Sequence, residues 1–140
     1  MHIESNFSMV MAEDKNKTAL PLIPQSEINT TLNAEFSHEG TLVLKNIFLQ
    51  HLYKFGQKRI GYFETETSDY QLFNLGMNFE IKNNKNPIDM NLGVKNIFNS
   101  SYTDHLSRFK QLEIPNQGIN FYLSIKLKLD KAFASRTSEQ

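Results

Sequence analysis

The chain has 140 residues, with fifteen basic and fifteen acidic side chains and no cysteine. A formal net charge of zero without long blocks of one sign argues against a nucleic-acid partner, and the lack of cysteine excludes disulfides and cysteine-based zinc or redox sites. No apolar run approaches the roughly 18 residues of a membrane helix. The mean hydropathy of -0.46 still permits transmembrane β-strands, because only every second residue of such a strand faces lipid.

Alternation of apolar and polar residues indicates three strands in the first half of the chain. The first strand has Ile3, Phe7, Met9 and Met11 on one face, and the second has Ile28, Thr30, Leu32, Ala34 and Phe36 on one face. Residues 41–51 are also expected to be extended. Their register stays open, because two sets compete for the apolar face: Leu42, Leu44 and Phe48 against Val43, Ile47 and Leu49.

The second half of the chain alternates more strictly and indicates three further strands. Their apolar positions are Phe73, Leu75, Met77, Phe79 and Ile81, then Ile88, Met90, Leu92 and Val94, then Phe121, Leu123, Ile125, Leu127 and Leu129. Wound as a helix, these residues would surround the cylinder without forming one apolar face, so the pattern favours strands. The charged residues between them, such as Glu80, Asp89 and Lys126, are expected on the opposite face.

The predicted connections alternate between short and long. Residues 37–40 and 83–87 are tight turns, whereas residues 12–27, 52–69 and 99–118 are long loops. Outer-membrane barrels combine short periplasmic turns with long extracellular loops in this way. We therefore expect an all-β fold, an open antiparallel meander of six strands of about 9 to 11 residues, because closure of such a barrel takes about eight strands.

Four segments carry a resemblance to one family. They are LPLIP (20–24), ETSDY (66–70), GVKNIFN followed by SYTDHLS (93–99 and 101–107), and IPNQGINF (114–121). In this order and at this spacing they resemble the C-terminal strands and loops of TonB-dependent outer-membrane receptors. The resemblance covers residues 1–129 and corresponds to the last quarter of a family barrel of about 22 strands. The last segment departs from the family pattern at Gln117-Gly118-Ile119.

The resemblance implies a fragment of a receptor for active uptake of a scarce solute across the bacterial outer membrane. Its partners would be outer-membrane lipid, the remaining barrel strands and plug, the TonB complex acting through that plug and its TonB box, and the transported solute. An iron or other metal complex, such as a siderophore or haem, is the expected substrate. We expect no enzyme activity, no cofactor and no catalytic residue, because no nucleophile motif or Gly-rich phosphate loop occurs.

Both ends of the chain differ from those of a complete receptor. The first ten residues lack the basic region, apolar core and cleavage site of a secretory signal, so we expect a piece of a longer protein. Family barrels end on an aromatic residue, whereas the corresponding residue here is Leu129. Residues 130–140 are polar and are expected to form a disordered tail.

The long loops and their margins contain four candidate substrate residues: Tyr53, Asp104, His105 and His51. Imidazole and carboxylate groups bind metals, which favours a metal or a metal complex as the substrate. No single segment contains paired ligand spacing, however, so these residues do not predict a resident metal site. The alternative interpretation is that they are solvated loop residues.

The same alternation of apolar and polar residues is also compatible with a second class of function. A soluble antiparallel β-barrel of the lipocalin kind, acting as a binding module, would place the alternating apolar face inward. A membrane barrel places the same residues outward. The direction in which Phe121, Leu123 and Ile125 face, and whether the strands close, would distinguish the two.

Overall fold

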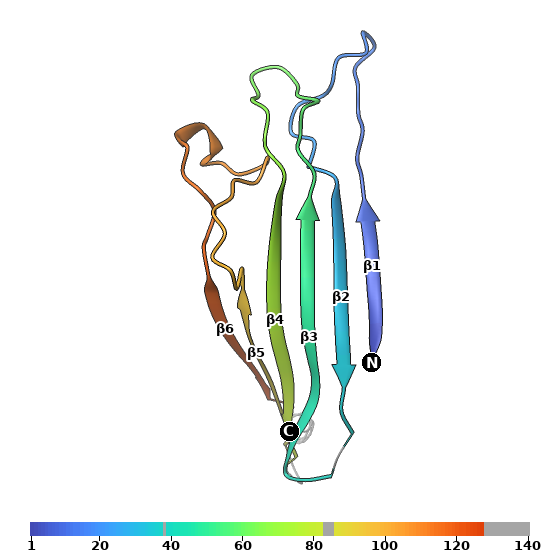
Figure 1. The fold of residues 1–140 in the computed structure, drawn as a ribbon, viewed down its shortest axis with the longest axis vertical. Helices are drawn as coiled ribbons and strands as arrows, with labels where there is room; N and C mark the ends of the chain where they lie inside the picture. Colours follow the sequence, from blue (N-terminus) through green and yellow to red (C-terminus); the bar gives the residue numbers. More distant parts are fainter. Residues whose placement is uncertain (38, 83–85, 128–140) are drawn as a thin grey trace, which may run out of the picture.

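The structure is a computed structural model that describes residues 1–37, 39–82 and 86–127. Its strands are β1 (His2–Ser8), β2 (Glu27–Glu35), β3 (Leu42–Lys54), β4 (Tyr70–Ile81), β5 (Ile88–Lys95) and β6 (Asn120–Leu127). They form one antiparallel sheet in chain order, with β1 and β6 as its two edges (Figure 1). The predicted all-β, open meander of six strands is confirmed.

Other expectations are met in part or lie outside the described residues. Strand lengths run from 7 to 13 residues, a wider range than the one predicted. A single 3-10 turn, η1 (Lys110–Leu112), lies in the last loop, and the described residues contain no helix long and apolar enough to cross a membrane. Leu129 and the predicted tail, residues 130–140, lie outside the described part of the chain.

The register gathers most of the apolar residues of the six strands on one face of the sheet. Continuous rows cross β4, β5 and β6: Leu75, Val94 and Phe121; Met77, Leu92 and Leu123; Phe79, Met90 and Ile125. Each strand of the described sheet contacts only its neighbours, and no second layer packs on this apolar face. Phe121 is therefore 74% exposed and Leu123 61% exposed.

A β-bulge at Lys45 resolves the ambiguous register of β3. Leu42 and Leu44 pair with Ile81 and Phe79, the register then shifts, and Ile47 and Leu49 pair with Met77 and Leu75. One extra residue reverses the alternation, so members of both competing sets reach the apolar face. The remaining members, Val43 and Phe48, lie on the polar face, where Val43 is only 3% exposed.

Side-chain amides connect the strands across the polar face. Asn46 donates to Asn33 at 2.8 Å, Asn78 donates to Asn46 at 2.6 Å, and Asn91 donates to Asn78 at 2.5 Å. This row, the amide ladder, joins β2, β3, β4 and β5. Because each bond requires cross-strand neighbours on one face, the ladder fixes the register that places the apolar residues on the other face.

A second amide row runs nearer the long loops. Gln50 donates to Asn29 at 3.0 Å, and Asn74 donates to Gln50 at 2.8 Å. The row ends where the backbone N–H of Asn96, the first residue after β5, donates to Asn74 at 2.9 Å. The sheet is thus tied to the start of the last loop by the same chemistry that holds its strands in register.

Two aromatic side chains lie across glycines between these rows. A Cβ on Gly76 would lie 2.4 Å from the tip of the Phe48 ring, and a Cβ on Gly93 would lie 2.6 Å from the Tyr122 hydroxyl. The Gly93 position is also closed by backbone, because its Cβ would lie 2.5 Å from the carbonyl oxygen of Leu75. Glycine at both positions lets the rings lie flat on the sheet.

We predict that Gly93→Ala destabilises the sheet by about 1–3 kcal/mol, because the new methyl group meets backbone that cannot move without breaking a strand pair. Gly76→Ala should cost less, since the end of a side chain can shift. Urea unfolding of the full chain in detergent measures both, with Ser124→Ala on the same face as the control. A Gly93→Ala midpoint equal to that of Ser124→Ala would contradict this packing.

Candidate functional site

Three long loops gather at one end of the sheet, at the top of Figure 1. They are loop 1 (residues 9–26), loop 2 (55–69) and loop 3 (96–119). All four buried polar residues of the described chain belong to them: Gln25, Thr67, Asn96 and His105. The loops therefore pack against one another through specific polar contacts. We call the place where Gln25, Thr67 and His105 meet the loop junction.

Gln25 connects all three loops. Its side-chain amide donates to the carbonyl oxygens of Phe55 at 2.8 Å and Ser68 at 3.1 Å, both at the ends of loop 2. Its carbonyl oxygen accepts from the backbone N–H of His105 in loop 3 at 3.1 Å. A buried amide needs partners for both its donors and its acceptor, and here each partner comes from another loop.

The His105 imidazole is enclosed at this junction, with its side chain only 1% exposed. Its Nδ1 lies 2.7 Å from the Thr67 hydroxyl and 3.1 Å from the Lys110 ammonium. An ammonium group can only donate, so Nδ1 is the acceptor and the proton resides on Nε2. Nε2 faces Glu64 Oε1 at 3.5 Å and has no hydrogen-bond partner within the described residues.

The charge state of His105 follows from these surroundings. Burial lowers the pKa of His105, and the Lys110 cation lowers it further, against the opposing effect of Glu64 and Asp104. The pKa of Lys110 is lowered as well, by burial against the opposing effect of Glu64. The imidazole is therefore neutral at neutral pH, in agreement with its role as a hydrogen-bond acceptor.

Glu64 shapes the tip of loop 2. Its carboxylate accepts from the backbone N–H groups of Leu22 at 2.7 Å and Gly61 at 2.8 Å. Burial would raise the pKa of Glu64, but these two bonds and the neighbouring His105 and Lys110 hold it below its ordinary value. Leu22 and Phe63 have left-handed backbone at φ 61° and 64°, and the Phe63 side chain is 97% exposed.

A second polar cluster, centred on Asp104, fastens loop 3 to the strand ends. Its carboxylate accepts from the Tyr70 hydroxyl at 2.8 Å and the Lys54 ammonium at 3.2 Å, while Lys54 also pairs with Glu27 at 3.1 Å. Asp104 also accepts from the backbone N–H of Leu106. Burial would raise the pKa of Asp104, but these bonds and the Lys54 charge hold it below its ordinary value.

The segments that resemble a receptor family make these loop contacts. Asn96 has φ 51° and exchanges hydrogen bonds with the backbone of Ser100 at 2.8 and 2.9 Å. Asn99, also at φ 51°, accepts from the backbone N–H of Ile119, and a Cβ on Gly118 would lie 2.4 Å from this Asn99 oxygen. The asparagines and the glycine thus close loop 3 on itself.

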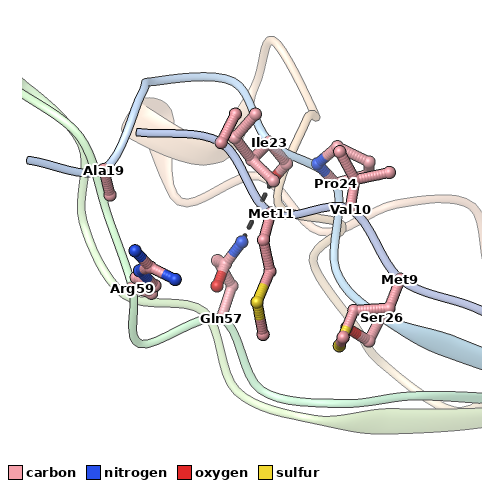
Figure 2. Close-up of a pocket in the computed structure, with 10 residues that line it drawn as sticks. Met9, Val10, Met11, Ala19, Ile23, Pro24, Ser26, Gln57 and Arg59 are labelled. Atoms are coloured by element: carbon pink, nitrogen blue, oxygen red, sulfur yellow. Dashed lines mark hydrogen bonds between the residues drawn. The ribbon is translucent and has the colours of Figure 1, made fainter. Parts of the chain in front are cut away.

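Loop 1 packs on loop 2 around a small cavity of about 80 Å³ (Figure 2). The Gln57 side chain donates to the carbonyl of Ile23 at 3.2 Å, which is the dashed line in Figure 2. A Cβ on Gly61 would lie 2.5 Å from Pro21, so glycine is needed for the close approach of the LPLIP segment. Ligand pockets usually start near roughly 300 Å³, so this cavity serves loop packing.

The four candidate residues fall into two places. Asp104 and His105 lie together in loop 3, in the clusters described above. His51 and Tyr53 lie in β3, and both occupy the apolar face of the sheet. This strand continues to Lys54, so the following loop begins later than predicted. The His51 ring stacks on Phe73 at 4.5 Å, and the Tyr53 hydroxyl donates to Asp69 at 3.0 Å.

The most connected residues of the junction were missed by sequence reasoning. Thr67 stands inside a motif that was recognised, but Gln25, Lys54 and Glu64 had no signal that set them apart from other polar residues. The partners of Gln25 are 30 to 80 residues away in the chain, and Lys54 and Glu64 bond to Asp104 and Leu22, which are also beyond any local pattern. In the described residues, no three histidine, aspartate or glutamate side chains form a group that could hold a metal ion.

Comparison with known proteins gives one structural likeness. No family model and no curated protein matches the sequence significantly. The solved structure of the copper transporter OprC superposes with a TM-score of 0.66 over 88% of this chain, at 20% sequence identity. The chain spans 20% of the length of that protein. At this identity the likeness shows the fold alone: the open meander has the same arrangement of strands as the matched fifth of the OprC chain.

We predict that Gln25→Ala loosens the loop junction by about 1–3 kcal/mol, because it removes three hydrogen bonds between loops and leaves the buried N–H of His105 without this acceptor. Trypsin should then cleave faster after Arg108 and Lys58, in loops 3 and 2. Gln111→Ala, at an exposed position in loop 3, is the matched control. Equal cleavage rates for the two variants would show that Gln25 does not hold the loops.

Proposed function

We propose that the chain forms the last strands of the barrel wall of a TonB-dependent receptor in the bacterial outer membrane. The observation that carries the proposal is the unpacked apolar face, where rows of Leu, Phe, Ile and Met cross the sheet and no other part of the described chain covers them. Exposed apolar area costs about 25 cal/mol per Å² in water, which lipid contact removes. The family motifs and the likeness to a transporter support the same assignment.

Backbone hydrogen bonding supports a place within a larger wall. Within the bilayer core each N–H and C=O must find a partner in the protein, and only helices and closed barrels provide this. The interior strands β2 to β5 are paired on both sides, whereas β1 and β6 are paired on one side within the described sheet. We propose that further strands of the parent receptor complete these two edges.

The polar face would line the inside of the barrel. It carries both amide rows, a Lys45–Glu80 ion pair, and Asp89 opposite Lys126 in the register. These groups are either paired with one another or suited to water and to a plug domain, which is how the interior of a large barrel is filled. The TonB complex would act on that plug, outside the segment described.

We propose a metal or a metal complex as the transported solute. The basis is the resemblance of the loop segments to a receptor family and the likeness to a copper transporter; iron complexes such as siderophores or haem belong to the same class. Substrate contact by Asp104, His105, Tyr53 and His51 stays a prediction. No catalytic residue is assigned, because the proposed task is transport.

The soluble lipocalin-like barrel is the weaker alternative. It requires the apolar face to be enclosed and the first and last strands to pair. In the described sheet β1 and β6 are opposite edges, and Phe121 and Leu123 are exposed. An open six-stranded sheet with this apolar face would aggregate in water unless another surface covered it.

Lysine placed at each of two adjacent residues of β6, which face opposite sides of the sheet, tests the membrane assignment. Ile125→Lys should reduce the amount of assembled receptor, because a lysine that faces lipid costs up to about 2–4 kcal/mol, depending on its depth in the bilayer. Ser124→Lys, one residue away on the polar face, should assemble normally. Surface abundance in cells that express the parent receptor is the measurement. Normal assembly of Ile125→Lys would contradict the lipid-facing assignment.

A further inference from the structure

Lys110 fastens the 3-10 turn of loop 3 to loop 2. Its ammonium donates to the carbonyl oxygen of Thr65 and to His105 Nδ1, so η1 is held against loop 2 at one point. Two grooves between the loops meet here, of about 320 Å³ and 560 Å³, and both are lined by Thr65 and Lys110. The Lys110 side chain therefore forms part of the partition between them.

The contact depends on the protonation state of His105. A neutral imidazole with its proton on Nε2 offers Nδ1 as an acceptor, which Lys110 uses. Protonation places a hydrogen on Nδ1 and a positive charge 3.1 Å from the ammonium. The hydrogen bond is then lost and replaced by repulsion between like charges in a poorly solvated position.

The groups around His105 determine what protonation changes. Loop 2 presents Glu64 and the uncharged Thr67, loop 3 presents Lys110 and Asp104, and loop 1 presents the neutral Gln25 amide. Glu64 lies 3.5 Å from Nε2 and favours the imidazolium, so the protonated ring keeps one ionic partner and loses the other. Acid therefore removes the Lys110 contact, while Glu64 and the Thr67 hydroxyl, which can accept from the protonated Nδ1, still hold the ring.

We propose that His105 is a proton-operated latch: neutral, it holds Lys110 and η1 against loop 2, and protonated, it releases them and joins the two grooves. The inference goes beyond the proposed transport function and does not depend on which solute is carried. Burial and the Lys110 charge lower the pKa of His105, so release requires a more acidic pH than an ordinary histidine would need. Glu64 and Asp104, with pKa values below their ordinary ones, stay ionised at about pH 5.

Spin labels on loop 2 and loop 3 can measure the release. The chain contains no cysteine, so Tyr62→Cys and Gln111→Cys provide two unique sites at exposed positions. We expect a narrow distance distribution between the labels at about pH 7.5 and a longer, broader one at about pH 5. The parent receptor is used in bilayers of outer-membrane lipid, with any cysteine outside this chain replaced by serine and with its β-structure checked by circular dichroism at each pH.

Three variants decide the outcome. His105→Gln keeps an acceptor for Lys110 but cannot titrate, so its distribution should stay narrow at both pH values. Lys110→Met removes the fastened group and keeps His105, so its distribution should be broad at both. Arg108→Met, which removes an exposed cation two residues away, should respond to pH like the unmodified chain.

The latch is overturned if the unmodified chain gives one distribution at both pH values. It is also overturned if His105→Gln opens in acid as the unmodified chain does, or if Lys110→Met stays narrow at both pH values. These results concern the loops alone. They can fail while Ile125→Lys still blocks assembly, so failure of the latch and failure of the membrane assignment are distinguishable.

Discussion

Strand register is the constraint on which the rest of this structure depends. Side chains alternate between the faces of a strand, so a slip of one residue in any pairing would send that strand's apolar set to the polar face. The amide ladder from Asn33 to Asn91 resists such a slip, because its bonds exist only when the four asparagines face the same side. Gly76 and Gly93 add a second restraint, since the rings of Phe48 and Tyr122 fit only over glycine.

The loops depend on the sheet in turn. Loop 3 leaves β5 at Asn96, whose N–H is bonded to Asn74 of the second amide row, and its later part is held by Asp104 against Tyr70 and Lys54 at the strand ends. The loop junction is therefore built from strand ends that the register has already placed. Its buried partners are polar, so its strength depends on hydrogen-bond acceptors and charges. A change in protonation can alter such contacts, whereas it would leave an apolar core unchanged.

Much of the fold could be predicted because apolar and polar residues alternate along a strand whose two faces have different surroundings. Phe121, Leu123 and Ile125 alternate without interruption, and their face and pairing follow directly. The bulge at Lys45 was not predicted, because one inserted residue only makes two apolar sets appear equally valid. Lys45 itself carries no turn signal that marks the insertion.

The site was less predictable for a different physical reason. Asp104 and His105 stood out as residue types that bind metals, yet their roles in the structure come from Lys54, Gln25 and Glu64. These partners lie in other loops and follow no period. Motif resemblance located the right segments, since LPLIP, ETSDY and GVKNIFN all contribute to loop packing, but it did not show which atoms meet.

The central claim is that one face of the sheet contacts lipid and the other does not. A single spin label moved through β6 from Asn120 to Leu127, in membranes of cells expressing the parent receptor, measures this most directly. Collision with oxygen should peak at Phe121, Leu123, Ile125 and Leu127, and collision with a water-soluble nickel complex should peak at the residues between them. Equal oxygen accessibility along the strand, or nickel accessibility highest at Leu123 and Ile125, would contradict the account.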